Sequence, residues 1–173
     1  MVIITENFDI LDDDDKAFLK KKCNNFKLSE PAWVDGDYIN YFNREILDFS
    51  DSFVQNIVKK VVVYVNTTLN RDDIELTVCW INKVDTTSNK NDEFHKDRNT
   101  VTLMVYLNED FDGGELEYVD LFNKKQLKWV PKKYSTILIN STTPHRVLPV
   151  NKGVRYSLIF FFHYKNKEHK SLI

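Results

Sequence analysis

Residues 154–162 read VRYSLIFFF, and this run decides how the rest of the chain must be arranged. A strand with one face in water alternates between apolar and polar residues, whereas this run is mostly apolar on both faces. We therefore expect a central strand over about Arg155–His163. One of its faces would meet the interior of a β-structure, and the other would be covered by helices.

The segment that precedes this strand, from about Ile74, has the two-residue period of β-strands. Its short apolar runs are separated by turn-like residues, which is typical of an all-β sandwich or barrel. Residues 112–114 and 149–153, which contain Gly or Pro, are expected to be connecting turns. The other expected strands are Glu75–Asn82, Phe94–Asp97, Val101–Leu107, Glu115–Val119, Gln126–Val130, Ser135–Asn140 and His145–Leu148.

The N-terminal part of the chain reads mainly as helix. Asp12–Asp15 would cap a first helix that continues to about Asn25. A longer helix over about Asp51–Leu69 is indicated by apolar residues at a spacing of four. The sequence therefore predicts a mainly β protein, a double-stranded β-helix (jelly roll) backed by N-terminal helices. We expect one domain, with helical support in 1–72, the jelly-roll core in 73–163 and a short charged tail in 164–173.

Composition excludes several classes of protein. The chain has 173 residues, of which 42% are hydrophobic, and a formal net charge of -2. This charge gives no electrostatic basis for binding nucleic acid. No apolar run approaches the roughly 20 residues that a membrane-spanning helix needs, so we expect no membrane partner. With only Cys23 and Cys79, and an acidic N-terminus unlike a secretory signal, we expect a cytoplasmic protein.

Two histidines and one aspartate carry the first chemical signal. His95 and Asp97, two residues apart on an expected strand, would project from the same face and could chelate one ion. A His-x-Asp pair alone is weak evidence, because such short patterns often occur by chance. His145 follows a proline at the start of another expected strand, where its side chain could be held rigidly. Two histidines and one carboxylate are typical of non-haem Fe(II) sites with open positions.

Arg155 carries the second signal. It follows an expected turn and would begin a strand beside that of His145, with the Ser157 hydroxyl on the same face. A buried arginine is costly unless it meets an anion. For Arg155 alone a protein carboxylate would be the simpler partner. Beside a metal site, it favours a bound cosubstrate that carries a carboxylate.

Four stretches resemble one known family. They are HKD at 95–97, YLNEDFDGGELEY at 106–118, TPHRVLPV at 143–150 and GVRYSLIFF at 153–161. They are similar to the Fe(II)- and 2-oxoglutarate-dependent dioxygenases, specifically the prolyl 4-hydroxylase-like branch. The resemblance implies that His95, Asp97 and His145 bind iron. It also implies that Arg155 and Tyr106 hold the C5 carboxylate of 2-oxoglutarate, that Leu116 packs on the cosubstrate, and that Ser157 completes an R-x-S pattern.

The same resemblance implies an activity. A relative of this kind would use O2 and 2-oxoglutarate to hydroxylate a prolyl or other side chain in a protein or peptide, releasing succinate and CO2. Ascorbate is a candidate additional cofactor. Two alternatives stay open: hydroxylation of a free amino acid or other small molecule, and a non-catalytic metal-binding jelly-roll module. Many relatives have a tyrosine on the strand before the His-x-Asp pair. Here this stretch has no tyrosine; Trp80 lies further back, and a longer polar loop, Asp85–Glu93, separates it from the pair. The substrate and the oligomeric state therefore do not follow from the sequence.

Overall fold

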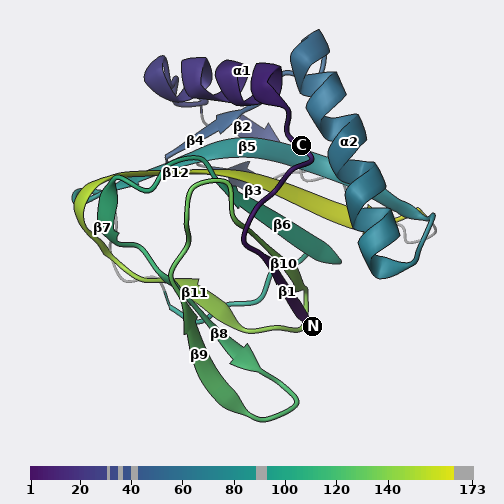
Figure 1. Cartoon of the computed structure of the whole chain (residues 1–173), viewed down its shortest axis with the longest axis vertical. Helices are drawn as coiled ribbons and strands as arrows, with labels where there is room; N and C mark the ends of the chain where they lie inside the picture. The colour runs from purple at the N-terminus through teal and green to yellow at the C-terminus, as the bar shows by residue number, and fades with distance from the viewer. Residues whose placement is uncertain (31, 35–36, 40–42, 89–92, 166–173) are drawn as a thin grey trace.

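Two antiparallel sheets face each other, and two helices lie on the outer face of the larger sheet (Figure 1). The computed structural model describes residues 1–30, 32–34, 37–39, 43–88 and 93–165. The elements are β1 (Val2–Thr5), α1 (Asp13–Asn24), β2 (Ala32–Val34), β3 (Asp37–Ile39), β4 (Arg44–Ile46), α2 (Ser52–Leu69), β5 (Ile74–Asp85), β6 (Val101–Tyr106), β7 (Phe111–Gly113), β8 (Leu116–Asp120), β9 (Lys125–Trp129), β10 (Thr136–Asn140), β11 (His145–Val147) and β12 (Val150–Tyr164).

The strand order is that of a jelly roll. The larger sheet runs β1-β10-β6-β12-β5-β4, and β7 also pairs with β12. The smaller sheet runs β11-β8-β9. β2 and β3 form a separate two-stranded pair. The predicted mainly β architecture backed by helices is therefore confirmed, with β12 in the middle of the larger sheet, as its apolar sequence requires.

Alternate residues of β12 point to opposite faces of the larger sheet. Leu158 and Phe160 are buried on the side covered by α1 and α2, in an apolar cluster that we call the helix-side core. Arg155, Ser157 and Ile159 lie on the other face, toward the space between the sheets, which we call the barrel interior. A smaller apolar cluster there, the barrel-side core, consists of Met104, Tyr106, Leu116, Trp129, Ile137 and Ile139.

The two helices begin where the sequence predicts. Asp12 caps α1, and its side chain accepts a hydrogen bond from the backbone N–H of Asp15 while the Asp15 carboxylate accepts one from the backbone of Asp12. Asp15 is buried, and it also accepts a hydrogen bond of 2.6 Å from Lys60 on α2. Lys60 also donates to Asp12, so both acids of the capping box join α1 to α2. Asp51 caps α2, and its side chain accepts hydrogen bonds from the N–H groups of Phe53 and Val54 in the first turn.

The expectation of a mainly helical N-terminal part is wrong in one respect, because this part also contributes strands. β1 pairs with β10 along Val2–Thr5, and β4 pairs with β5. Both strands are three or four residues long. Such short segments carry no readable period, and their partners lie far away in the sequence.

The two expected turns are also wrong. Residues 111–113 form β7, which pairs with residues 150–153 at the start of β12. Gly113 and Gly153 both have positive φ angles, of 78° and 79°. A Cβ at Gly113 would lie 2.2 Å from the carbonyl oxygen of Pro149, and one at Gly153 would lie 2.5 Å from that of Asp110. The glycines therefore permit two paired segments to approach closely, rather than reversing the chain.

Two predicted segments extend beyond the described residues. The tail expected over 164–173 is described only to residue 165, and the loop Asp85–Glu93 lacks residues 89–92. Within the described part of the chain, no helix is long and apolar enough to cross a membrane.

Candidate metal centre

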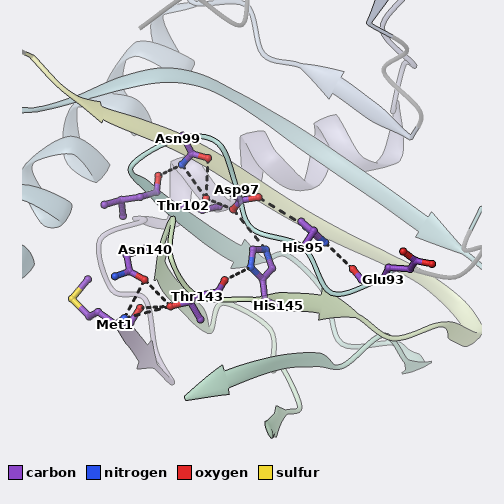
Figure 2. Close-up of polar contacts among 10 residues, drawn as sticks. Met1, Glu93, His95, Asp97, Asn99, Thr102, Asn140, Thr143 and His145 are labelled. Carbon is purple, nitrogen blue, oxygen red and sulfur yellow. Dashed lines mark hydrogen bonds and ion pairs between the residues drawn. The ribbon is translucent and has the colours of Figure 1, made fainter. Parts of the chain in front are cut away.

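His95, Asp97 and His145 come together at one end of the barrel interior (Figure 2). One ligand atom from each lies within 4.8 Å of the others. Nε2 of His95 is 3.9 Å from Oδ1 of Asp97, and Nε2 of His145 is 3.6 Å from Oδ2. The predicted triad is therefore assembled, with the geometry of a set that could hold one ion.

The other ring nitrogen of each histidine fixes its tautomer. Nδ1 of His95 donates to the carbonyl oxygen of Glu93 at 3.0 Å, and Nδ1 of His145 donates to that of Thr143 at 3.1 Å. A carbonyl oxygen can only accept, so each Nδ1 carries the proton. Each Nε2 is thus unprotonated, and its lone pair is available to a metal ion between the three side chains, as metal-ligating histidines require.

The backbone holds the two histidines side by side. The N–H of each donates to the carbonyl oxygen of the other at 2.9 Å, which makes an isolated bridge between residue 95 and β11. The predicted strand Phe94–Asp97 is therefore reduced to one bridging residue. His95 and Asp97 do converge, but a regular strand is not what brings them together.

Asp97 is positioned by side chains that the sequence analysis did not single out. The hydroxyl of Thr102, on β6, donates to Oδ2 of Asp97. Nδ2 of Asn99 donates to Oγ1 of Thr102 at 3.1 Å and to the carbonyl oxygen of Val101. Asn99 and Thr102 are both buried. This relay leaves Oδ1 of Asp97 for a metal ion, and its only signal in the sequence is a threonine within an apolar strand.

The triad is open on one side. The side chain of His95 is 45% exposed, whereas those of His145 and Asp97 are 6% and 14% exposed. The buried ligands are therefore held by the barrel, and His95 lies toward the solvent. The side of His95 is therefore the open side of the three residues.

Arg155 lies deeper in the barrel interior, next to Tyr106. Its Cζ is 5.8 Å from the centroid of the Tyr106 ring, and its Nη1 donates to the carbonyl oxygen of Gly114 at 3.0 Å. Ser157 is directly opposite Tyr106 between β12 and β6, and all three side chains are buried. Burial raises the pKa of Tyr106, against a smaller opposite effect of the Arg155 charge, so its phenol stays protonated at neutral pH.

Leu116 and Gly114 complete the surroundings of Arg155. Leu116 is completely buried on β8, between Val147 and Trp129. Gly114 has a φ of 67°, and a Cβ there would be 3.3 Å from Cδ of Arg155. The second glycine of the pair thus makes room for the arginine, a role that the sequence analysis did not predict.

The expected neighbourhood of His145 and Arg155 is wrong. β11 pairs with β8 in the smaller sheet, whereas β12 pairs with β5, β6 and β7. The two residues therefore belong to different sheets, and β6 connects their surroundings. Thr102, next to the triad, and Tyr106, next to Arg155, share the interior face of β6, about 13 Å apart along the strand.

A known protein family matches the part of the chain that contains these site residues. The sequence profile of the 2OG-Fe(II) oxygenase superfamily matches residues 79–163, which include the triad, Tyr106 and Arg155. No curated protein matches the chain significantly in sequence.

Solved structures of similar fold include enzymes with different reactions. A Pseudomonas putida prolyl-4-hydroxylase is 20% identical, with a TM-score of 0.67, and the match covers 94% of this chain and 92% of the hydroxylase. A Trichoplax adhaerens prolyl hydroxylase, in complex with a hypoxia-inducible factor peptide fragment, is 16% identical, with a TM-score of 0.69 and coverage of 95% and 84%. The non-haem α-ketoglutarate-dependent epimerase SnoN of nogalamycin biosynthesis is 10% identical, with a TM-score of 0.68 and coverage of 94% and 78%. At these identities the likeness shows the fold alone.

Proposed function

Because the chain belongs to the 2OG-Fe(II) oxygenase superfamily, we propose that it hydroxylates a prolyl or other side chain in a protein or peptide. The observation that carries this proposal is the joint presence, in one barrel interior, of the triad and of a buried arginine. A metal-binding module without turnover has no need of a cationic anchor for a cosubstrate.

In this proposal, Nε2 of His95, Nε2 of His145 and Oδ1 of Asp97 hold Fe(II). The set has two imidazoles and one carboxylate, as non-haem iron sites with open positions do. The Nδ1–H bonds to Glu93 and Thr143 orient both rings before the ion binds. The donor from Thr102 orients the carboxylate in the same way.

Arg155, Tyr106 and Ser157 bind the C5 carboxylate of 2-oxoglutarate in this proposal. The guanidinium supplies charge-assisted donors, and the phenol and the hydroxyl each supply a further one. Leu116 packs against the carbon chain of the cosubstrate. When bound, iron would activate O2 with two electrons from the oxidative decarboxylation of 2-oxoglutarate, so that one oxygen atom enters succinate, CO2 is released and the other oxygen atom serves the hydroxylation. The chain orients these groups and encloses them between two sheets.

A free amino acid or another small molecule is the second candidate substrate. The observation that favours it is the compact fold, which is shared with an epimerase of nogalamycin biosynthesis as well as with prolyl hydroxylases. Fold alone does not separate these substrates.

The test is an anaerobic titration of the metal-free protein with Fe(II) and 2-oxoglutarate, which follows the visible metal-to-ligand charge-transfer band. We expect a band that needs both components and that Asp97→Ala abolishes. If Fe(II) binds and no band forms, the proposal is wrong and a metal-binding module is the better description. If the band forms, succinate release in the presence of O2 that is stimulated by peptides, but not by free amino acids, would favour the first substrate class over the second.

A further inference from the structure

The backbone of Arg155 lies where β12 changes partners on one of its edges. The ladder between β12 and β6 ends at the pair Ser157–Tyr106. The ladder between β12 and β7 begins at the pair Gly153–Phe111, which leaves three residues of β12 between the two ladders, with Arg155 in the middle. On the other edge these residues stay paired with β5. The arginine that we assign to the cosubstrate is therefore carried by a stretch with a regular ladder on one edge only.

The side chain of Asn108 spans this interval. Its Nδ2 donates to the carbonyl oxygen of Val154 at 2.7 Å, and its Oδ1 accepts from the backbone N–H of Tyr156 at 2.8 Å. The backbone N–H of Leu107 donates to the carbonyl oxygen of Tyr156 at 2.9 Å. A side-chain amide carries a donor and an acceptor, as a peptide group does. Asn108 thus continues the pairing of β12 and holds the backbone on both sides of Arg155.

The segment that begins at Asn108 also receives the other end of the arginine. Nη1 of Arg155 donates to the carbonyl oxygen of Gly114 at 3.0 Å. The N–H of Gly114 in turn donates to the carbonyl oxygen of Pro149 at 2.8 Å, just before β12 begins. Residues 108–114 therefore hold Arg155 at its backbone and at its guanidinium.

The placement of this guanidinium matters because hydrogen bonds weaken steeply away from their preferred distance and angle. In the proposed function one end of 2-oxoglutarate is at the metal triad, so the length of the cosubstrate fixes where Arg155 must meet the other end. Gly153, two residues earlier, has a φ of 79°, and a glycine restrains the backbone least. A restraint on the residues that flank Arg155 therefore acts directly on the anchor.

We propose that Asn108 is a positioning residue for the cosubstrate anchor: its amide fixes the backbone on both sides of Arg155 and so places the guanidinium for the C5 carboxylate of 2-oxoglutarate. This inference rests on the proposed function and adds a residue to the same site. Asn108 acts through Arg155 and not by contact with the cosubstrate. A purely structural amide would stabilise the fold without affecting the affinity for 2-oxoglutarate, and the test separates these two roles.

Asn66, on α2, offers a matched control. Its Nδ2 donates to the carbonyl oxygen of Ile74 at 3.0 Å, and its Oδ1 accepts from the N–H of the same residue at 3.1 Å. Its Nδ2 also donates to the carbonyl oxygen of Val62 at 3.0 Å. Ile74 belongs to the helix-side core. Asn66→Ala therefore removes a comparable pair of bonds between an amide and the start of a strand, on the side of the sheet opposite to the cosubstrate.

Anaerobic titration of the Fe(II)-loaded chain with 2-oxoglutarate, followed by the charge-transfer band, measures the dissociation constant in the unaltered chain and in both variants. We expect Asn108→Ala to raise this constant roughly fivefold or more and Asn66→Ala to leave it nearly unchanged, although urea denaturation should show that both variants lose stability. An unchanged constant in Asn108→Ala, or equal increases in the two variants, would overturn the inference alone. No band in the unaltered chain would refute the proposed function, and the inference with it.

A double-mutant cycle tests whether Asn108 acts through the arginine. In the Arg155→Ala background, Asn108→Ala should weaken 2-oxoglutarate binding little further, because no guanidinium is left to place. A full additional loss of affinity there would overturn the positioning role. Asn108→Asp is the variant to use if Asn108→Ala does not fold, because it keeps the shape and the acceptor for Tyr156, and its carboxylate cannot donate to Val154. Its loss of affinity should likewise disappear when Arg155 is absent.

Discussion

Alternate residues of β12 enter two interiors of unlike composition. On the helix side, Leu158, Phe160 and Phe162 are completely buried among apolar residues of α1, α2 and the neighbouring strands. On the barrel side, Arg155 and Ser157 are almost as deeply buried, at 2% exposure each, although both are polar. Equal burial therefore accompanies opposite chemistry on the two faces of one strand.

The difference shows where stability and binding reside. Apolar side chains on the helix side stabilise the fold through the surface that they remove from water. Burying a guanidinium instead costs free energy unless an anion or several acceptors receive it. The barrel side therefore differs from the helix side in its buried polar groups, which bind the cosubstrate in the proposed function. Mutations on the two faces should then affect different measurements.

The largest effect on stability is expected at Phe160. Phe160→Ala should lower the free energy of unfolding by about 3–5 kcal/mol, because it removes a completely buried ring and leaves a cavity. Urea denaturation measures this change, and the folded fraction should still bind 2-oxoglutarate with unchanged affinity. A loss below about 1 kcal/mol would mean that the helix side can repack, and the contrast between the faces would weaken.

The reverse pattern is expected at Arg155. Arg155→Ala should raise the dissociation constant of 2-oxoglutarate by an order of magnitude or more, since a charge-assisted hydrogen bond contributes about 1.5–3 kcal/mol. The charge-transfer band in an Fe(II) titration measures this constant. Arg155→Lys is the matched control that keeps the charge and loses the planar guanidinium. Its dissociation constant should lie between that of the unaltered chain and that of Arg155→Ala. An unchanged dissociation constant in Arg155→Ala would show that Arg155 does not bind the carboxylate of 2-oxoglutarate.

The sequence predicts this site better than it predicts the route by which the site forms. The order of the motifs singles out His95, Asp97, His145 and Arg155 as candidates, because ligand chemistry depends on residue type, and the structure brings the first three together. The expected strand around His95 is wrong, and so is the expected pairing of the strands of His145 and Arg155. Pairing partners far apart in the chain leave no trace in local periodicity.

The fold shows the same limit. Helix α1 carries a capping box, and α2 carries a cap and an apolar spacing, so their bounds were predictable. The strands β1 and β4 are too short to carry a period, and the pairing of β7 depends on glycines that also occur in turns. The relay from Asn99 through Thr102 to Asp97 requires a tertiary hydrogen bond, which residue types alone do not reveal.

An indirect effect, on iron binding alone, is expected at Thr102, on the barrel side of β6. Thr102→Val keeps the shape and removes the donor to Asp97, so the affinity for Fe(II) should fall by roughly 10–100-fold. Thr136→Val is the matched control on β10, because the buried Thr136 hydroxyl has no hydrogen-bond partner within the described part of the chain. The control should leave Fe(II) binding unchanged and should not destabilise the fold. Equal losses in both variants would show that Thr102 has only a structural role.

The smallest effect is expected on the helix side, at the two cysteines. Burial raises the pKa of Cys79 to about 12, and burial together with the Glu45 charge raises that of Cys23 to about 12. At pH 8 the reactive thiolate is then a fraction of about 10⁻⁴, so a thiol reagent should modify the folded chain slowly.

Cys79 is directly opposite Phe160 between β5 and β12. Phe160→Ala should therefore speed the modification of Cys79 by more frequent opening, whereas Arg155→Ala, on the other face of β12, should leave its rate nearly unchanged. Equal acceleration by both variants would mean that the two faces of β12 open together, and the contrast between them would hold for binding but not for stability.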